Sequence, residues 1–412
     1  MTKEKSTVPR LRFPGFTDAW KQRKLGEVLK ERNESRSPSA DVPLVSFTVE
    51  NGVTPKTERY NREFLVRDEN KKYKFTQLDD IVYNPANLKF GAIARNKYGA
   101  AVFSPIYVTY GVLSEAHPLF VELIVTSTNF IQRALRYQEG TVYERMAVKS
   151  FDLLRSEILL PALPEQEAIG NFFSDLDQLI TLHQRKLDDV KELKKALLQK
   201  MFPKGNGNDF PELRFPEFTD AWKQRKLGEV ATFAKGNGYS KKDLVIEGSP
   251  IILYGRLYTK YETVISEVDT FVSVEDNKNS VVYSEGGEVL VPASGESSLD
   301  IARASVVAKK GIILGGDINI IRLHSEIFPV FLALTISNGK QQKGLSKRAQ
   351  GKSVVHLHNS DLKKVDLDFP TLPEQEAIGS FFSDLDQLIT LHQRQLDHLK
   401  LLKKALLQQM FI

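Results

Sequence analysis

Residues 163–202 read LPEQEAIGNFFSDLDQLITLHQRKLDDVKELKKALLQKMF, and residues 372–411 read LPEQEAIGSFFSDLDQLITLHQRQLDHLKLLKKALLQQMF. The proline at the second position and the acidic residues after it are typical of the first turn of a helix. Apolar residues then recur at steps of three and four. This spacing predicts one long helix in each copy, at 163–203 and 372–412.

A shorter repeated block precedes each long one. Residues 11–28 read LRFPGFTDAWKQRKLGEV, and residues 213–230 read LRFPEFTDAWKQRKLGEV. The segments between the blocks, 29–162 and 231–371, do not align with each other beyond their edges. A solenoid would keep its repeats similar, because each repeat packs on the next. The chain is therefore a duplicated frame that carries two different inserts. It predicts domains at 1–162 and 213–371, joined by a linker at 204–212.

The two long helices have apolar residues at heptad spacing. Neither helix has a partner inside its own half, so we expect the two helices to pack on each other, and the duplication favours an antiparallel pair. A homodimeric coiled coil is the alternative, because heptads alone do not identify the partner. His183 and His392 occupy equivalent seam positions and are interpreted as seam residues rather than catalytic groups. The other predicted seam residues are Ile169, Phe173, Leu176, Ile180, Leu187, Ile378, Phe382, Leu385, Ile389 and Leu396.

The inserts contain both strand-like and helix-like patterns. Runs rich in β-branched residues, bounded by Gly, Pro or Asn, predict strands at 80–84, 100–110, 288–293 and 305–314. Residues 120–137 and 328–342 have helical spacing. The predicted fold class is α/β: two mixed α/β domains separated by two long antiparallel coiled-coil helices, with an internal pseudo-twofold duplication.

The composition restricts the class of protein. The 412 residues include no cysteine, which excludes disulfides and thiolate metal sites. The first residues lack the apolar core of a signal peptide and no apolar run is long enough to cross a bilayer, so a cytoplasmic protein is expected. A net charge of +5 permits nucleic-acid binding without indicating it.

Three patterns resemble active-site or ligand motifs but are incomplete. The YNPAN run at 83–87 lacks the second proline and the aromatic residue of the methyltransferase loop N-P-P-[YF], and is interpreted as a strand that ends in a turn. The GKS at 351–353 is not a phosphate-binding loop, because Ser346 stands where its first glycine belongs. His356 and His358 alternate on a predicted strand without an evident third ligand. We therefore predict no catalytic residue and no metal site.

The order of repeated blocks and variable inserts resembles the specificity subunits of type I restriction-modification systems over essentially the whole chain. LPEQEAIG before each long helix, and LRFPGF…W…LGEV before each insert, look like the conserved segments of that family. The resemblance implies a non-catalytic target-recognition subunit that reads a bipartite, asymmetric site on double-stranded DNA. The dissimilar inserts on a pseudo-symmetric frame independently predict a split, asymmetric target.

The resemblance also implies the partners. Two modification (methyltransferase) subunits would dock on the helices, and two restriction subunits would complete the assembly. S-adenosylmethionine, ATP and Mg would then bind to those partners, with no cofactor on this chain. One alternative is a two-site protein–protein scaffold on the same frame, without DNA contact. The other is an autonomous methyltransferase, which the incomplete motif disfavours.

DNA-contacting side chains are expected in the inserts. Lys and Arg suit phosphates, and Arg, Asn, Gln, Ser and Thr suit base edges. The candidates in the first insert are Lys71, Lys72, Lys74, Lys89, Arg95, Asn96, Lys97, Tyr143 and Arg145. Those in the second are Lys235, Asn237, Tyr239, Lys241, Lys242, Arg256, Ser294, Ser297, Lys347, Arg348, Gln350, Lys352, Ser353, His356 and His358. The cluster from Lys347 to His358 is the strongest of these.

Overall fold

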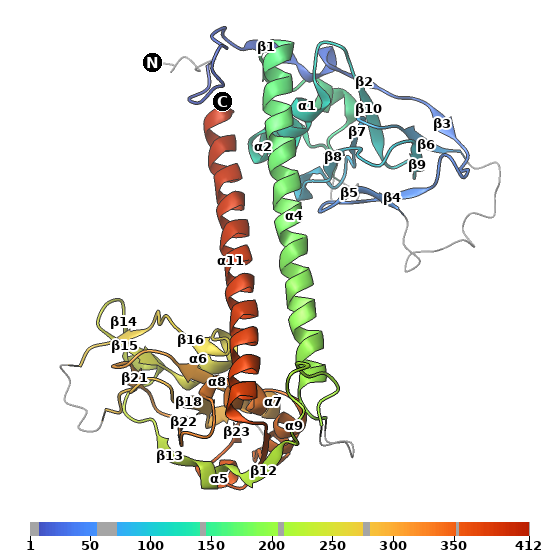
Figure 1. Ribbon diagram of the computed structural model, residues 1–412. Coiled ribbons are helices and arrows are strands. Elements are labelled where there is room, and N and C mark those ends of the chain that lie inside the picture. The colour runs from blue at the N-terminus through green and yellow to red at the C-terminus, as the bar shows by residue number, and fades with distance from the viewer. Residues whose placement is uncertain are drawn as a thin grey trace. The chain divides into compact units, whose positions relative to one another are not determined.

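The computed structural model describes residues 8–55, 72–140, 146–204, 210–274, 281–351 and 354–411. The chain divides into unit 1, Met1–Leu182 with Asp397–Ile412, and unit 2, His183–Leu396. Figure 1 shows the two long helices, α4 (Leu163–Met201) in green and α11 (Leu372–Met410) in red. The division differs from the predicted domain boundaries, because each α/β domain packs on part of both helices. In the part of the chain that is described, no helix has the length and apolar character to cross a membrane.

Unit 1 contains a four-stranded antiparallel sheet of order β2–β10–β7–β8, a three-stranded sheet β3–β6–β9 and a hairpin β4–β5. Its strands are β1 (Lys21–Lys24), β2 (Leu29–Glu31), β3 (Ser35–Arg36), β4 (Val45–Thr48), β5 (Gly52–Pro55), β6 (Tyr73–Thr76), β7 (Ile81–Tyr83), β8 (Ile93–Arg95), β9 (Ala101–Phe103), β10 (Val108–Val112) and β11 (Glu157–Leu160). Its shorter helices are α1 (Pro118–Val125), α2 (Thr128–Ala134) and α3 (Ser150–Leu154), with 3-10 turns η1 (Leu25–Glu27), η4 (Leu88–Phe90) and η5 (Leu135–Tyr137).

Unit 2 contains a five-stranded sheet of order β13–β22–β18–β20–β16 and a four-stranded sheet of order β14–β17–β15–β21. The strands are β12 (Lys223–Lys226), β13 (Ala231–Lys235), β14 (Leu244–Val245), β15 (Ser249–Ile252), β16 (Val264–Ile265), β17 (Phe271–Val272), β18 (Val289–Pro292), β19 (Ser294–Gly295), β20 (Ser305–Val307), β21 (Ile313–Leu314), β22 (Ile318–Leu323), β23 (Val355–His356) and β24 (Asp366–Phe369). The helices are α5 (Leu227–Val230), α6 (Tyr254–Thr259), α7 (Ser298–Ile301), α8 (Pro329–Ile336), α9 (Gly339–Arg348) and α10 (Asn359–Leu362), with a 3-10 turn η6 (Lys241–Asp243).

The repeated blocks join the two ends of each insert in the same way. In unit 1, β1 pairs antiparallel with β11, and Lys21 is opposite Leu160. In unit 2, β12 pairs antiparallel with β24, and Lys223 is opposite Phe369. Each insert therefore begins and ends on one two-stranded ladder, directly before a long helix. This closure explains how one frame accepts inserts of different structure.

The first turns of each long helix are part of a domain core rather than of the helix pair alone. Ile169 and Phe173 are buried in the unit 1 core with Trp20 and Phe120. Their counterparts Ile378 and Phe382 are buried in the unit 2 core. Burial of a phenylalanine at such a position contributes on the order of 2–3 kcal/mol. The apolar positions that were predicted as seam residues thus also anchor the inserts.

The two long helices are antiparallel within each unit. In unit 1, Lys403 of α11 donates to Asp177 of α4 at 2.5 Å, and Phe411 lies near Phe173, with ring centroids 6.4 Å apart. In unit 2, the equivalent lysine and aspartate, Lys194 and Asp386, form the same ion pair. In both units, residues further along α4 contact residues earlier in α11, as antiparallel packing requires. The predicted fold class is confirmed.

The predicted seam positions are buried to different degrees. Seven of them are buried, namely Ile169, Phe173, Leu176, Leu187, Ile378, Phe382 and Leu396. Ile180, Leu385 and Ile389 are half-buried. All ten therefore turn apolar surface away from solvent, as the heptad spacing requires.

Both helical runs predicted in the inserts are broken in two. The 120–137 run divides into α1 and α2, because the Ser127 hydroxyl accepts a hydrogen bond from the backbone N–H of Phe130 at 3.2 Å and caps a new helix. The 328–342 run divides into α8 and α9 at Asn338. Gly339 has φ +62°, a conformation that side chains disfavour. Periodicity alone did not reveal these breaks.

Candidate nucleic-acid interface

A buried glutamine at the start of each long helix holds the insert on the frame. The side-chain oxygen of Gln166 accepts from the backbone N–H of His117 at 2.9 Å, and its amide donates to the carbonyls of Pro161 and Glu115. Gln375 repeats all three bonds with Phe328, Pro370 and Glu326. Both glutamines are almost fully buried. Each of these hydrogen bonds is made to a backbone atom, so the side chain of the partner residue can differ between the inserts.

A bidentate ion pair reinforces the same junction. Arg12 donates two hydrogen bonds to Glu165, at 2.6 and 2.8 Å, and Arg214 donates two to Glu374 at the same distances. These bonds raise the pKa of each arginine above its ordinary value. Sequence reasoning did not single out these arginines or the glutamines. Their presence at the same position of both copies was the available signal.

The strongest predicted cluster of unit 2 is brought together in the structure. β19 and β23 pair antiparallel, with Ser294 opposite His356. The Ser294 hydroxyl and the His356 Nδ1 are 3.0 Å apart, and the rings of His356 and His358 are stacked at 6.5 Å between centroids. Both imidazoles are exposed, whereas Ser294 is buried. Ser294 therefore orients His356 rather than facing solvent itself.

Basic residues lie beside this ladder. Gln350 exchanges two backbone hydrogen bonds with His356, at 2.8 and 3.1 Å. Lys347 and Arg348 form the last turn of α9, immediately before it, and both are exposed. Among the described residues neither of these two side chains has an ion-pair partner. The arrangement combines positive charge, suited to phosphate, with exposed Gln and His side chains, which suit base edges.

The remaining unit 2 candidates fall into three groups. Lys235, Asn237, Lys241, Lys242 and Ser297 are exposed, and Ser297 caps α7. Arg256 is half-buried and pairs with Asp269 at 3.2 Å. Tyr239 is only 3% exposed and packs in an apolar cluster. Its prediction as a DNA contact is corrected, because a core side chain cannot reach a phosphate or a base.

In unit 1 the structure changes the interpretation of several candidates. Lys72 and Lys89 are exposed, and Lys97 is exposed but pairs with Glu122 at 2.8 Å. Arg95 pairs with Asp79 and Glu122, and Lys74 pairs with Glu31, so both are already neutralised. Asn96 is fully buried. Its amide binds Thr76, Gln77 and Gly99, and its oxygen accepts from two backbone N–H groups, at 98 and 99. Asn96 holds a loop and is likewise removed from the candidate contacts.

Five candidates lie outside the described residues, namely Lys71, Tyr143, Arg145, Lys352 and Ser353. The YNPAN run at 83–87, one of the incomplete motifs, is a strand that ends in a turn, as interpreted from the sequence. β7 ends at Tyr83, and the Asn84 side-chain oxygen accepts from the backbone N–H of Ala86 at 3.1 Å.

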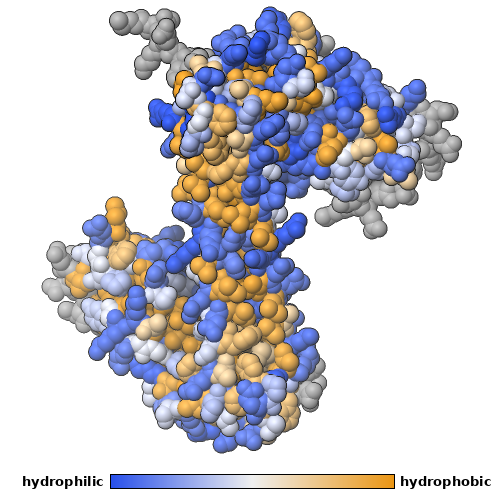
Figure 2. Space-filling view, turned by 45° about the horizontal axis from the view of Figure 1, so that its top comes forward, coloured by the Kyte–Doolittle hydropathy of each residue, from blue (hydrophilic) through white to orange (hydrophobic). Residues whose placement is uncertain are grey.

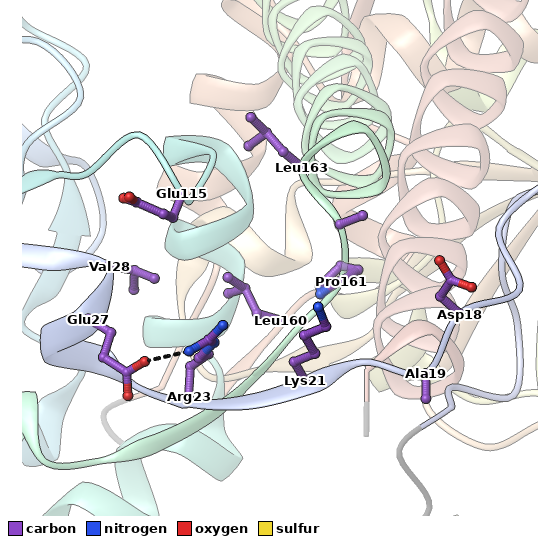
Figure 3. A pocket seen from close by; sticks show the side chains of 11 residues that line it. Asp18, Ala19, Lys21, Arg23, Glu27, Val28, Glu115, Leu160, Pro161 and Leu163 are labelled. Atoms are coloured by element: carbon purple, nitrogen blue, oxygen red, sulfur yellow. Dashed lines mark hydrogen bonds and ion pairs between the residues drawn. The ribbon is translucent and has the colours of Figure 1, made fainter.

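A surface pocket of about 370 Å³ in unit 1 belongs to the frame. Figure 3 shows that it lies between the β1 segment and the start of α4, with the side chains of Lys21 and Arg23 close to Leu160 and Pro161. Arg23 pairs with Glu27 at 3.1 Å. Most of its lining comes from the short repeated block or adjoins the long one. The pocket therefore does not distinguish one insert from the other.

Comparisons with known proteins agree on one family. Residues 219–401 match the type I restriction modification DNA specificity domain. The type I restriction enzyme MjaVIII specificity subunit of Methanocaldococcus jannaschii is 22% identical over 280 residues, which cover 65% of this chain and 64% of that protein. The putative type I restriction enzyme MjaX specificity subunit of the same organism is 23% identical over 285 residues, 66% of this chain and 62% of that one. The chain thus matches less than two thirds of the length of these relatives.

A solved structure shows the same fold. The type I restriction-modification system S subunit from M. genitalium has a TM-score of 0.63 with 15% sequence identity, covering 98% of this chain and 99% of that one.

Proposed function

We propose that this chain, which belongs to the family of type I restriction-modification specificity subunits, reads double-stranded DNA through its two inserts and carries no catalytic site. One observation carries the proposal. The same glutamine clamp and the same Arg–Glu pair hold two α/β domains whose sheets differ in strand number and order. Two different domain surfaces that are attached by identical contacts suit a protein that reads two different sequences.

The target that follows is bipartite and asymmetric. Each domain reads one half-site, and the exposed cluster at Lys347, Arg348, Gln350 and His356 is the proposed reading surface of unit 2. Lys and Arg would neutralise phosphates, and the imidazole and amide would contact base edges. Lys89 is the proposed phosphate contact of unit 1.

The frame is the proposed docking site for two methyltransferase subunits. Exposed leucines occur at equivalent positions in the two units: Leu179, Leu182 and Leu402 in unit 1, and Leu388, Leu391 and Leu193 in unit 2. Figure 2 shows apolar surface over the long helices. Exposed apolar surface repeated in this way suits a partner that binds twice. Restriction subunits would join that complex, and S-adenosylmethionine, ATP and Mg would bind the partners.

A base-resolution map of adenine methylation tests this function directly. DNA from cells that express the methyltransferase partner is compared with and without the gene for this chain. We expect one split, asymmetric motif to lose its methylation when the gene is deleted. An unchanged map would remove the DNA-reading proposal and favour a protein–protein scaffold.

Replacing Lys347 and Arg348 with alanine should weaken DNA binding to cognate and unrelated sequences alike. Each lost phosphate contact reduces the slope of log affinity against log salt by about 0.9, so the double variant should lower the slope by about 1.8. Binding is measured by fluorescence anisotropy of the complex with the methyltransferase at several salt concentrations.

Two variants make this measurement specific. Lys364→Ala is the control, because Lys364 is also exposed but lies next to β24, at the end of the insert that adjoins the long helix; its salt slope should stay unchanged. His356→Ala should instead cost about 1–3 kcal/mol for the cognate sequence only. Equal salt slopes for the double variant and Lys364→Ala would contradict the assignment.

A further inference from the structure

The histidine pair of the long helices is not accounted for by DNA reading or by partner docking. His183 and His392 stand at the same position of the two repeated blocks, within LITLHQR. Both belong to unit 2, where their ring centroids lie 5.9 Å apart at an interplanar angle of 55°. Leu187 and Leu396, one turn further along each helix, are buried. The two imidazoles therefore form a polar layer beside buried leucines of the seam.

The hydrogen bonding of the two imidazoles is incomplete. The Nδ1 atom of each ring is buried and has no hydrogen-bond partner within the described residues. A neutral imidazole has one N–H donor and one lone-pair acceptor, and a buried polar atom without a partner costs free energy. A lone pair on each of two neighbouring rings would supply two of the ligands of a transition-metal ion.

We propose that His183 and His392 bind one divalent transition-metal ion of the Zn²⁺ or Ni²⁺ type between the two helices. Metal–nitrogen bonds of about 2.0–2.1 Å place the centres of two imidazoles on one metal about 4.5–6.4 Å apart, for angles at the metal of about 90–180°. The observed separation of 5.9 Å lies within this range. Imidazole nitrogen is a preferred ligand of these ions.

The site has two protein ligands, which sets its character. Among the described residues, no group of three or more His, Asp or Glu side chains is placed to hold a metal. Because the pair supplies only two ligands, water molecules would complete the coordination. Such an ion would act as a cross-link between α4 and α11 and not as a reaction centre. This inference departs from the sequence-based expectation of no metal, and it does not depend on DNA binding.

The test is a titration of the tag-free full chain, first treated with chelator, with NiCl₂ and separately with ZnCl₂. Isothermal titration calorimetry should show one ion per chain bound by this pair. His183→Asn and His392→Asn should each weaken that binding at least tenfold. His398→Asn is the matched control, because His398 lies on α11 like His392 and is exposed. This variant should bind the ion as tightly as the wild type does. The pair His356→Asn and His358→Asn should also leave this ion in place.

A measurement on the wild-type chain avoids dependence on the folding of variants. Paramagnetic Ni²⁺ should broaden the ring NMR signals of His183 and His392 before those of the other histidines. The midpoint of thermal unfolding should rise with Ni²⁺ and return with EDTA, since a ligand of the folded state stabilises it by mass action. Absence of binding, or broadening confined to His356 and His358, would overturn the proposal and leave a polar seam layer only.

Discussion

Replacing Arg214 with methionine is expected to lower the free energy of unfolding of unit 2 by about 3–5 kcal/mol. Glu374 is only 1% exposed, and both of its oxygens accept hydrogen bonds from Arg214. Without the guanidinium, the carboxylate stays buried without a counter-ion, which is the costly way to break such a pair. The chain has two tryptophans, and Trp222 packs against Phe331 in unit 2. Its fluorescence in a Trp20→Phe background, during denaturant unfolding, reports this loss.

Two further variants distinguish the buried pair from an ordinary surface one. Arg225 also pairs with glutamates, Glu229 and Glu326, but the side chains of Arg225, Glu229 and Glu326 are 40%, 54% and 43% exposed. Arg225→Met should therefore cost less than about 1 kcal/mol. Combining Arg214→Met with Glu374→Leu should recover much of the lost stability, because no charge is left buried. Equal losses for Arg214→Met and Arg225→Met would show that the Arg214–Glu374 pair does not hold the insert on the frame.

Replacing Leu391 with glutamate should remove one of the two proposed methyltransferase subunits from the complex. Leu391 is 51% exposed on α11, and its counterpart Leu182 is 47% exposed on α4. A charge buried in an apolar contact is expected to cost several kcal/mol, enough to weaken association more than a hundredfold. Because the two sites are equivalent, Leu391→Glu should leave one subunit bound. The double variant with Leu182→Glu should leave none. Native mass spectrometry counts the subunits.

A charge control accompanies this experiment. Gln395 is exposed one turn beyond Leu391, and Gln395→Glu introduces the same charge without removing an apolar side chain. This variant should still bind two methyltransferase subunits. If Leu391→Glu also retains both subunits, the exposed leucines are not the docking surface, whereas the result for DNA reading is unaffected.

Several features of this protein were predictable because they are encoded locally and twice. The LPEQ…MF blocks specify helices through a proline at the second position and apolar steps of three and four, and the structure places α4 and α11 where these signals begin. Repetition of both blocks around dissimilar inserts predicted two different domains on one frame. Hydrophobic periodicity and repetition can be read from neighbouring residues, so neither requires knowledge of contacts distant in sequence.

Other features depend on contacts between residues far apart in the chain. Asn96 and Tyr239 resembled exposed polar residues of loops, yet both are buried, because burial depends on which elements pack over a loop. The helix breaks at Ser127 and Asn338 depend on capping and backbone conformation that periodicity does not contain. Ser294 meets His356 only because β19 pairs with β23 across 62 residues.

The sequence alone thus determined the duplication, the two helices and the division into frame and inserts, since these follow from local pattern. Only the tertiary structure decided which polar side chains face solvent and which residues hold each insert in place, since both depend on long-range packing.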